Sequence, residues 1–115
     1  KQGEEILKKM FAMDSGASML GEVALVPKES PINRSGLLFM NTLFDENACC
    51  HVAVGEGFQE VIEGAENMTL DEIHALGVND SIIHVDFMIG SDDLDITGIC
   101  DDGTEIPVFR NGTWA

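Results

Sequence analysis

The chain has 115 residues, which is the usual size of one domain with one core. Hydrophobic residues make up 44% of it, which argues against disorder, and no apolar run approaches the roughly 20 residues needed to span a bilayer. The net charge of −15 repels nucleic acid and anionic membranes. The composition therefore predicts a folded acidic domain that binds neither.

The first residue and the cysteines bear on the length of the natural chain and on its cellular compartment. It begins with Lys1 rather than Met and shows no secretory signal, so we expect a piece cut from a longer cytoplasmic chain. Of its three cysteines, Cys49 and Cys50 are adjacent, which makes a poor disulfide framework. Reduced thiols in the cytoplasm are the expectation.

The first half of the chain alternates between apolar segments and breaker residues. Residues 2–13 have the apolar spacing of a short amphipathic helix, and residues 21–26 suit a strand that Pro27 ends. Residues 27–36 are rich in turn formers and predict a loop, and the mainly apolar residues 37–44 suit a buried strand.

Residues 45–55 leave two interpretations open. Asp45 could cap a helix that runs through Val54 and stops at Gly55. The apolar residues that follow His51 are equally short enough for a strand.

The second half contains clearer signals. Thr69 and Glu72 form a capping box that predicts a helix to about residue 76. Residues 82–89 suit a strand, and residues 94–109 suit a hairpin around Asp-Asp-Gly, with a further turn at Asn111-Gly112. We therefore expect a mixed, strand-dominated α+β domain with two or three short helices.

The strand 82–89 carries the most informative pair of side chains. His84 and Asp86 are its only polar members, and side chains two apart on a strand point to the same face. Burying an imidazole and a carboxylate together is costly without compensation. A divalent metal ion would supply that compensation and make chemical use of both groups.

Three further polar residues lie between apolar runs, namely Glu22, Glu46 and His51. With His84 and Asp86 they give two imidazoles and three carboxylates, which suits zinc, cobalt or manganese, singly or as a bridged pair. Each residue also has a simpler interpretation, because a lone histidine in an apolar strand is often hydrogen-bonded core. Glu22 could equally be the exposed position of an edge strand.

The amino-acid sequences of several segments, in their order along the chain, resemble the C-terminal part of the thermophilic metallo-aminopeptidase family of the aminopeptidase T, S and II type. The segments are Gly21-Glu22-Val23-Ala24-Leu25-Val26-Pro27, Phe44-Asp45-Glu46-Asn47, Ile83-His84-Val85-Asp86-Phe87 and Pro107-Val108-Phe109-Arg110-Asn111-Gly112-Thr113-Trp114. The resemblance covers nearly the whole chain from about Asp14, so residues 1–115 would be the metal-binding C-terminal portion of a longer aminopeptidase.

The resemblance implies an exopeptidase that removes N-terminal residues from peptides with broad specificity, in the cytoplasm and as a homodimer. It also implies two divalent ions, usually zinc or cobalt, although manganese or magnesium is compatible with the residues. Carried over by motif, the metal ligands are Glu22, Glu46, His51, His84 and Asp86. Glu22 additionally takes the catalytic assignment, as the carboxylate that bridges the ions or steers the attacking water.

Two departures from the family pattern stand out. The family supplies another glutamate ligand from a region upstream of these residues, and the chain has no counterpart. Phe58 stands where members often carry a tyrosine, and a phenyl ring cannot donate a hydrogen bond to a developing oxyanion.

Two alternatives from other functional classes accompany the enzyme hypothesis. The chain alone could be a non-catalytic folded module or a dimerisation piece with an incomplete metal site. A calcium module could use the aspartates of residues 92–102, although their spacing matches no complete EF-hand loop.

Overall fold

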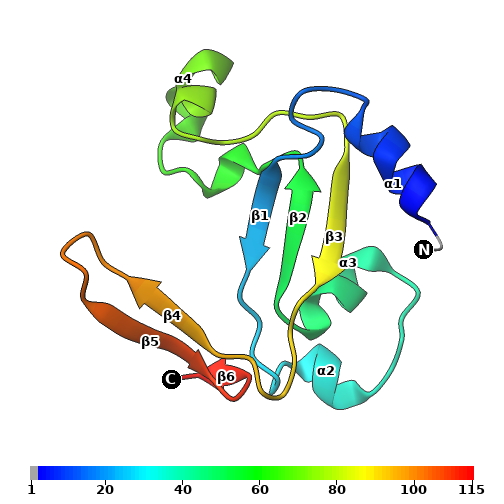
Figure 1. Cartoon of the computed structure of the whole chain (residues 1–115), viewed down its shortest axis with the longest axis vertical. Coiled ribbons are helices and arrows are strands. Elements are labelled where there is room, and N and C mark those ends of the chain that lie inside the picture. Colours follow the sequence, from blue (N-terminus) through cyan, green and yellow to red (C-terminus); the bar gives the residue numbers. More distant parts are fainter. Residues whose placement is uncertain (1–2) are drawn as a thin grey trace. The chain divides into compact units, whose positions relative to one another are not determined.

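The computed structural model describes residues 3–115 and combines two small sheets with short helices (Figure 1). The predicted mixed α+β class is confirmed. The chain forms two compact units, one from the segment ending at Val23 and Val52–Phe87, the other from Ala24–His51 and Met88–Ala115. Among residues 3–115, none of the helices has the length and apolar character needed to cross a membrane.

The first sheet has the strand order β1-β2-β3, with β1 at Leu20–Ala24, β2 at His51–Gly55 and β3 at His84–Met88 (Figure 1). The predicted strands at 21–26 and 82–89 are confirmed, although β1 begins one residue earlier and ends two residues earlier than predicted and β3 is shorter at both ends. The ends of these strands lie at the division between the units, and four of the five β2 residues belong to the first unit.

Strand β2 settles the ambiguity of residues 45–55. The short 3-10 helix η1 at Glu46–Ala48 ends before the strand begins, and burial alternates along β2, with His51, Ala53 and Gly55 buried. Gly55 adopts a φ of 100°, and a side chain there would overlap the carbonyl of Ile83. Glycine therefore allows the close approach of β2 to the backbone before β3.

The helices of the first unit largely follow the sequence signals. Helix α1 spans Glu4–Phe11, and α4 spans Leu70–Ala75 behind the predicted capping box. The 3-10 helices η2 at Gln59–Val61 and η3 at Ala65–Asn67 lie between β2 and α4. The small core of this unit consists of Ala17, Ala53, Ile73 and Ile83.

The second unit contains the second sheet, in the order β4-β5-β6. Strands β4 (Ile96–Ile99) and β5 (Glu105–Arg110) form the predicted hairpin, and β5 pairs with β6 (Thr113–Trp114) across the predicted second turn. Phe109 is fully buried, with its ring 4.5 Å from that of Trp114.

The prediction of a buried strand at residues 37–44 was wrong. The segment is exposed and leads into the short helix α3 at Thr42–Asp45, and the predicted loop at 27–36 contains the helix α2 at Pro31–Ser35. The Asp45 carboxylate accepts hydrogen bonds from the N–H groups of Phe39 and Asn41. These local hydrogen bonds hold the apolar segment in a loop, so the segment does not pair with a strand.

Candidate metal centre

Strand β3 presents an imidazole and a carboxylate on one face, as the sequence predicted. His84 Nε2 lies 3.3 Å from Oδ1 of Asp86 and 3.3 Å from Oε2 of Glu22, which comes from β1. All three side chains are mostly buried, with exposed fractions of 24% for His84 and Glu22 and 13% for Asp86. Two carboxylates therefore converge on one ring nitrogen.

The other ring nitrogen of His84 has a backbone partner. Nδ1 lies 2.8 Å from the carbonyl oxygen of Glu56, which can only accept a hydrogen bond, so Nδ1 carries the proton. In the neutral ring, Nε2 then offers a lone pair to two carboxylates. That arrangement is repulsive unless a proton or a cation lies between these atoms.

His51 has the same kind of partner. It is the first residue of β2 and is only 1% exposed, and its Nδ1 lies 3.0 Å from the carbonyl oxygen of Cys49. Metal-ligating histidines usually donate their second ring N–H to a carbonyl or carboxylate in this way. Both histidines of the candidate site thus share the tautomer in which Nδ1 carries the proton.

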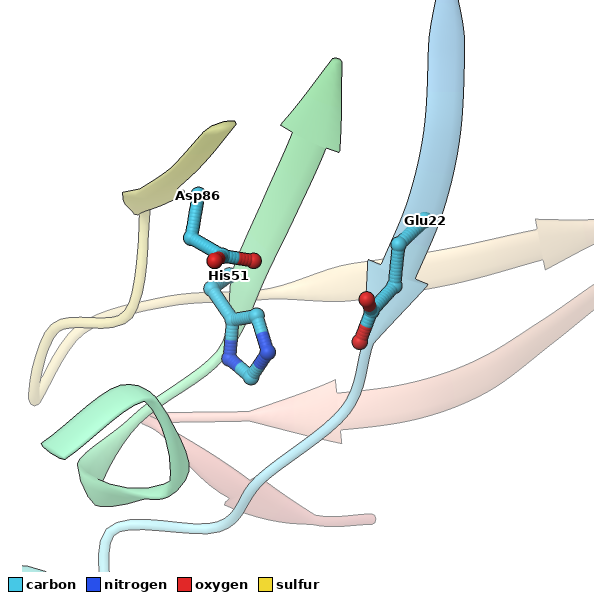
Figure 2. Close-up of side chains that lie close together, drawn as sticks. All are labelled: Glu22, His51 and Asp86. Atoms are coloured by element: carbon cyan, nitrogen blue, oxygen red, sulfur yellow. The ribbon is translucent and has the colours of Figure 1, made fainter. Parts of the chain in front are cut away.

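Three of the predicted ligands come together closely enough to hold one ion. Potential ligand atoms of Glu22, His51 and Asp86 lie within 4.8 Å of one another, and Figure 2 shows the three side chains coming from three neighbouring strands. Asp86 Oδ1 is buried and accepts no hydrogen bond of good geometry from residues 3–115. A buried carboxylate oxygen without such a partner is costly, and a divalent ion with mixed nitrogen and oxygen ligands would satisfy it. The donor set of Glu22, His51 and Asp86 therefore fits the divalent metal ion that the sequence predicted.

The electrostatics of His84 support the same conclusion. Burial by itself lowers the pKa of His84, but the Glu56 carbonyl and the carboxylates of Asp86 and Glu22 together outweigh it and raise the pKa above its ordinary value. The surroundings of the ring thus favour a positive charge at this point, which a bound cation would also provide.

Glu46, the fifth predicted ligand, is half-buried in η1 on the segment that leads into β2. It does not belong to the group of close ligand atoms among the described residues.

Three aspartates of the calcium alternative accept hydrogen bonds from other residues of the second unit. Asp93 accepts from Ser91, and Asp95 and Asp102 accept backbone N–H groups in the turns.

Two features of the site were not predicted. The carbonyl partners of the histidines leave no trace in the sequence, because every residue type has a carbonyl. The Phe58 ring contacts the ring of His84, with centroids 5.0 Å apart and planes tilted by 47°. The sequence marked Phe58 only by its departure from the family pattern.

The geometry defines a candidate divalent-metal site on an antiparallel sheet, and comparisons with known proteins give its family. Residues 1–114 match the model of the thermophilic metalloprotease (M29) family. The chain is 53% identical to Aminopeptidase 2 of Geobacillus stearothermophilus and 54% identical to Aminopeptidase AmpS of Bacillus subtilis, over all 115 residues in both cases. The chain belongs to the M29 metalloprotease family.

A solved structure agrees with this assignment. The structure of wild-type AmpT from Thermus thermophilus matches 99% of the chain with a TM-score of 0.83 and 47% sequence identity. The chain spans 28% of the length of each of these three proteins. The resemblance to the aminopeptidase T, S and II type is thereby confirmed.

Proposed function

We propose that the protein to which this chain belongs is a metal-dependent aminopeptidase, and that residues 1–115 are its metal-binding C-terminal portion. The observation that carries the proposal is the convergence of two carboxylates on the lone pair of His84 Nε2, beside a second histidine held in the same tautomer. Family membership and the names of the relatives support the peptidase activity.

The residues divide into ligands and supports. We assign Glu22, Glu46, His51, His84 and Asp86 as ligands, and we also assign to Glu22 the catalytic role, as the carboxylate that would be shared between two ions or would orient the attacking water. When bound, divalent ions would polarise a peptide carbonyl and lower the pKa of water, so that water could lose a proton and attack the carbonyl near neutral pH. The carbonyl groups of Glu56 and Cys49 hold the imidazoles, and the neighbouring carboxylates attract the free amine of a peptide N-terminus.

The finer features of the proposal come from the family resemblance. They are two ions of zinc or cobalt, broad specificity for the N-terminal residue, a homodimer and a cytoplasmic location. Two imidazoles and three carboxylates are a donor set that is compatible with more than one divalent ion.

The test uses the full-length protein and leucyl-p-nitroanilide as substrate. We predict that activity is lost on chelation, returns with cobalt or zinc, and falls at least about 100-fold in the His84→Ala variant, because the variant lacks one of the proposed metal ligands. His74→Ala is the matched control, since His74 is exposed on α4. Full activity and unchanged metal content in His84→Ala would contradict the proposal. Turnover by residues 1–115 alone would count against the non-catalytic module.

A further inference from the structure

A second feature of the first unit adjoins the candidate metal centre. A pocket of about 360 Å³ lies against β1, at the low end of the size range of ligand sites. Three segments form its walls: residues 20–23, residues 57–62 and residues 76–79. Its lining is mainly apolar and includes Leu20, Val23, Phe58, Ile62, Leu76 and Val78.

Two residues connect the pocket to the metal centre. Glu22 lines the pocket and also lies 3.3 Å from His84 Nε2. Phe58 lines it as well, and its ring contacts that of His84. A group seated in the pocket would therefore lie next to the atoms proposed to act on a peptide bond.

Hydrogen bonds hold the walls together. The N–H of Gly57 donates to the carbonyl of Asn79, at 2.9 Å. The side-chain amide of Asn79 donates to the carbonyl groups of Gly16 and Gly55, at 2.9 and 2.6 Å. The two loops are thus fixed to each other and to the end of β2, which preforms the cavity.

We propose that this pocket receives the side chain of the substrate's N-terminal residue and that, within the broad range of residues accepted, it favours apolar side chains such as leucine. The inference rests on the proposed aminopeptidase function and deepens it. Among the described residues that line the pocket, Glu22 is the one with a charge. An apolar side chain gains free energy by leaving water there, whereas an acidic side chain is desolvated beside a carboxylate.

The test measures kcat/KM in the cobalt-loaded full-length protein for alanyl, leucyl, phenylalanyl and glutamyl p-nitroanilides. The wild type should prefer leucine to alanine and to glutamate by at least about tenfold, which is the range of discrimination by apolar pockets. Val78→Phe fills the pocket and should reduce the leucine-to-alanine ratio at least about tenfold. Ile62→Ala enlarges the pocket and should raise the phenylalanine-to-leucine ratio.

Ile106→Ala is the matched control for Ile62→Ala, because it removes the same atoms from a half-exposed position on β5. The ratios should remain unchanged in this control. Activity with unaltered ratios in both pocket variants, or a wild-type preference for glutamate, overturns the pocket assignment and leaves the aminopeptidase proposal standing. Absence of hydrolysis of all four substrates by the metal-loaded wild type overturns both.

Discussion

At the scale of single residues, the candidate site depends on the second nitrogen of each imidazole. His84 donates Nδ1–H to the carbonyl of Glu56, and His51 donates Nδ1–H to that of Cys49. A backbone carbonyl cannot turn away or lose its acceptor character, so it fixes both the tautomer and the ring orientation. Both imidazoles are thereby oriented by the backbone itself.

The titration of His84 tests this electrostatic description. In chelator-treated protein, the pKa of His84 should lie above the ordinary value of about 6.5 because of Glu56, Asp86 and Glu22, in spite of burial. A raised pKa means that the protonated ring stabilises the metal-free fold. This contribution is complete below the unfolded-state pKa and is lost as the pH rises through the folded-state pKa.

Proton NMR of the His84 ring measures the effect. Glu22→Gln should lower the pKa, because it removes one of the two carboxylates 3.3 Å from Nε2. Glu63→Gln, at an exposed position, is the control and should leave the pKa unchanged. An unchanged pKa in Glu22→Gln would show that the ring does not sense that carboxylate.

Phe58 gives a second prediction at this scale. Its ring contacts His84 but offers no hydrogen-bond donor to a developing oxyanion. In the full-length protein, Phe58→Tyr should raise kcat roughly tenfold with unchanged metal content, because it adds such a donor. Phe87→Tyr, on β3, is the control. Equal kcat values for Phe58→Tyr and the wild type would indicate that another group already serves the oxyanion.

At the scale of elements, two turn glycines of the second unit differ in the space around their Cβ positions. Gly103 has a φ of 82° with open space around the Cβ position, whereas Gly112 has a φ of 75° and a Cβ there would lie 2.6 Å from the carbonyl oxygen of Ser91. Gly103→Ala should reduce the free energy of unfolding by about 1 kcal/mol, the cost of a left-handed backbone. Gly112→Ala adds a backbone clash and should cost at least about 2 kcal/mol.

Urea unfolding of the two variants measures the difference. The variants share the substitution and the φ region, so the additional loss in Gly112→Ala reports the contact with Ser91. Equal losses in the two proteins would mean that the backbone around Ser91 moves aside at little cost.

The elements also show what sequence patterns can predict. The capping box of Thr69 and the Asn111-Gly112 turn are local signals that depend on neighbours in the chain, and both occur as predicted. The apolar run 37–44 was misjudged because its apolar side chains suggested burial, whereas the carboxylate of Asp45 closes the segment into an exposed loop.

The candidate site was predicted to a similar extent and for similar reasons. The spacing of His84 and Asp86 on a strand predicted their shared face, and Glu22 and His51 were marked as polar residues in apolar surroundings. Their convergence is a long-range pairing of strands, which spacing alone does not give. The contact of Phe58 with His84 had no sequence signal, because any apolar residue could occupy a position after β2.

At the scale of the whole molecule, the chain spans 28% of the length of the aminopeptidases that it resembles. Within residues 3–115, no residue of the amphipathic helix α1 is buried, and Ile6 on its apolar face is 66% exposed. The chain nevertheless contains ligand-competent residues on three strands of one sheet. Metal binding by these residues can therefore be measured separately from peptidase activity, and before it.

The most direct test is the metal content of the full-length protein after dialysis against zinc, measured by mass spectrometry for the wild type and for Asp86→Asn. Asp86→Asn keeps the shape of the side chain and removes its charge. The wild type should retain zinc, and Asp86→Asn should contain at least one zinc ion per chain fewer, whereas Asp71→Asn, exposed on α4, should match the wild type. Equal zinc content in Asp86→Asn and the wild type would contradict the assignment of this site as the metal centre.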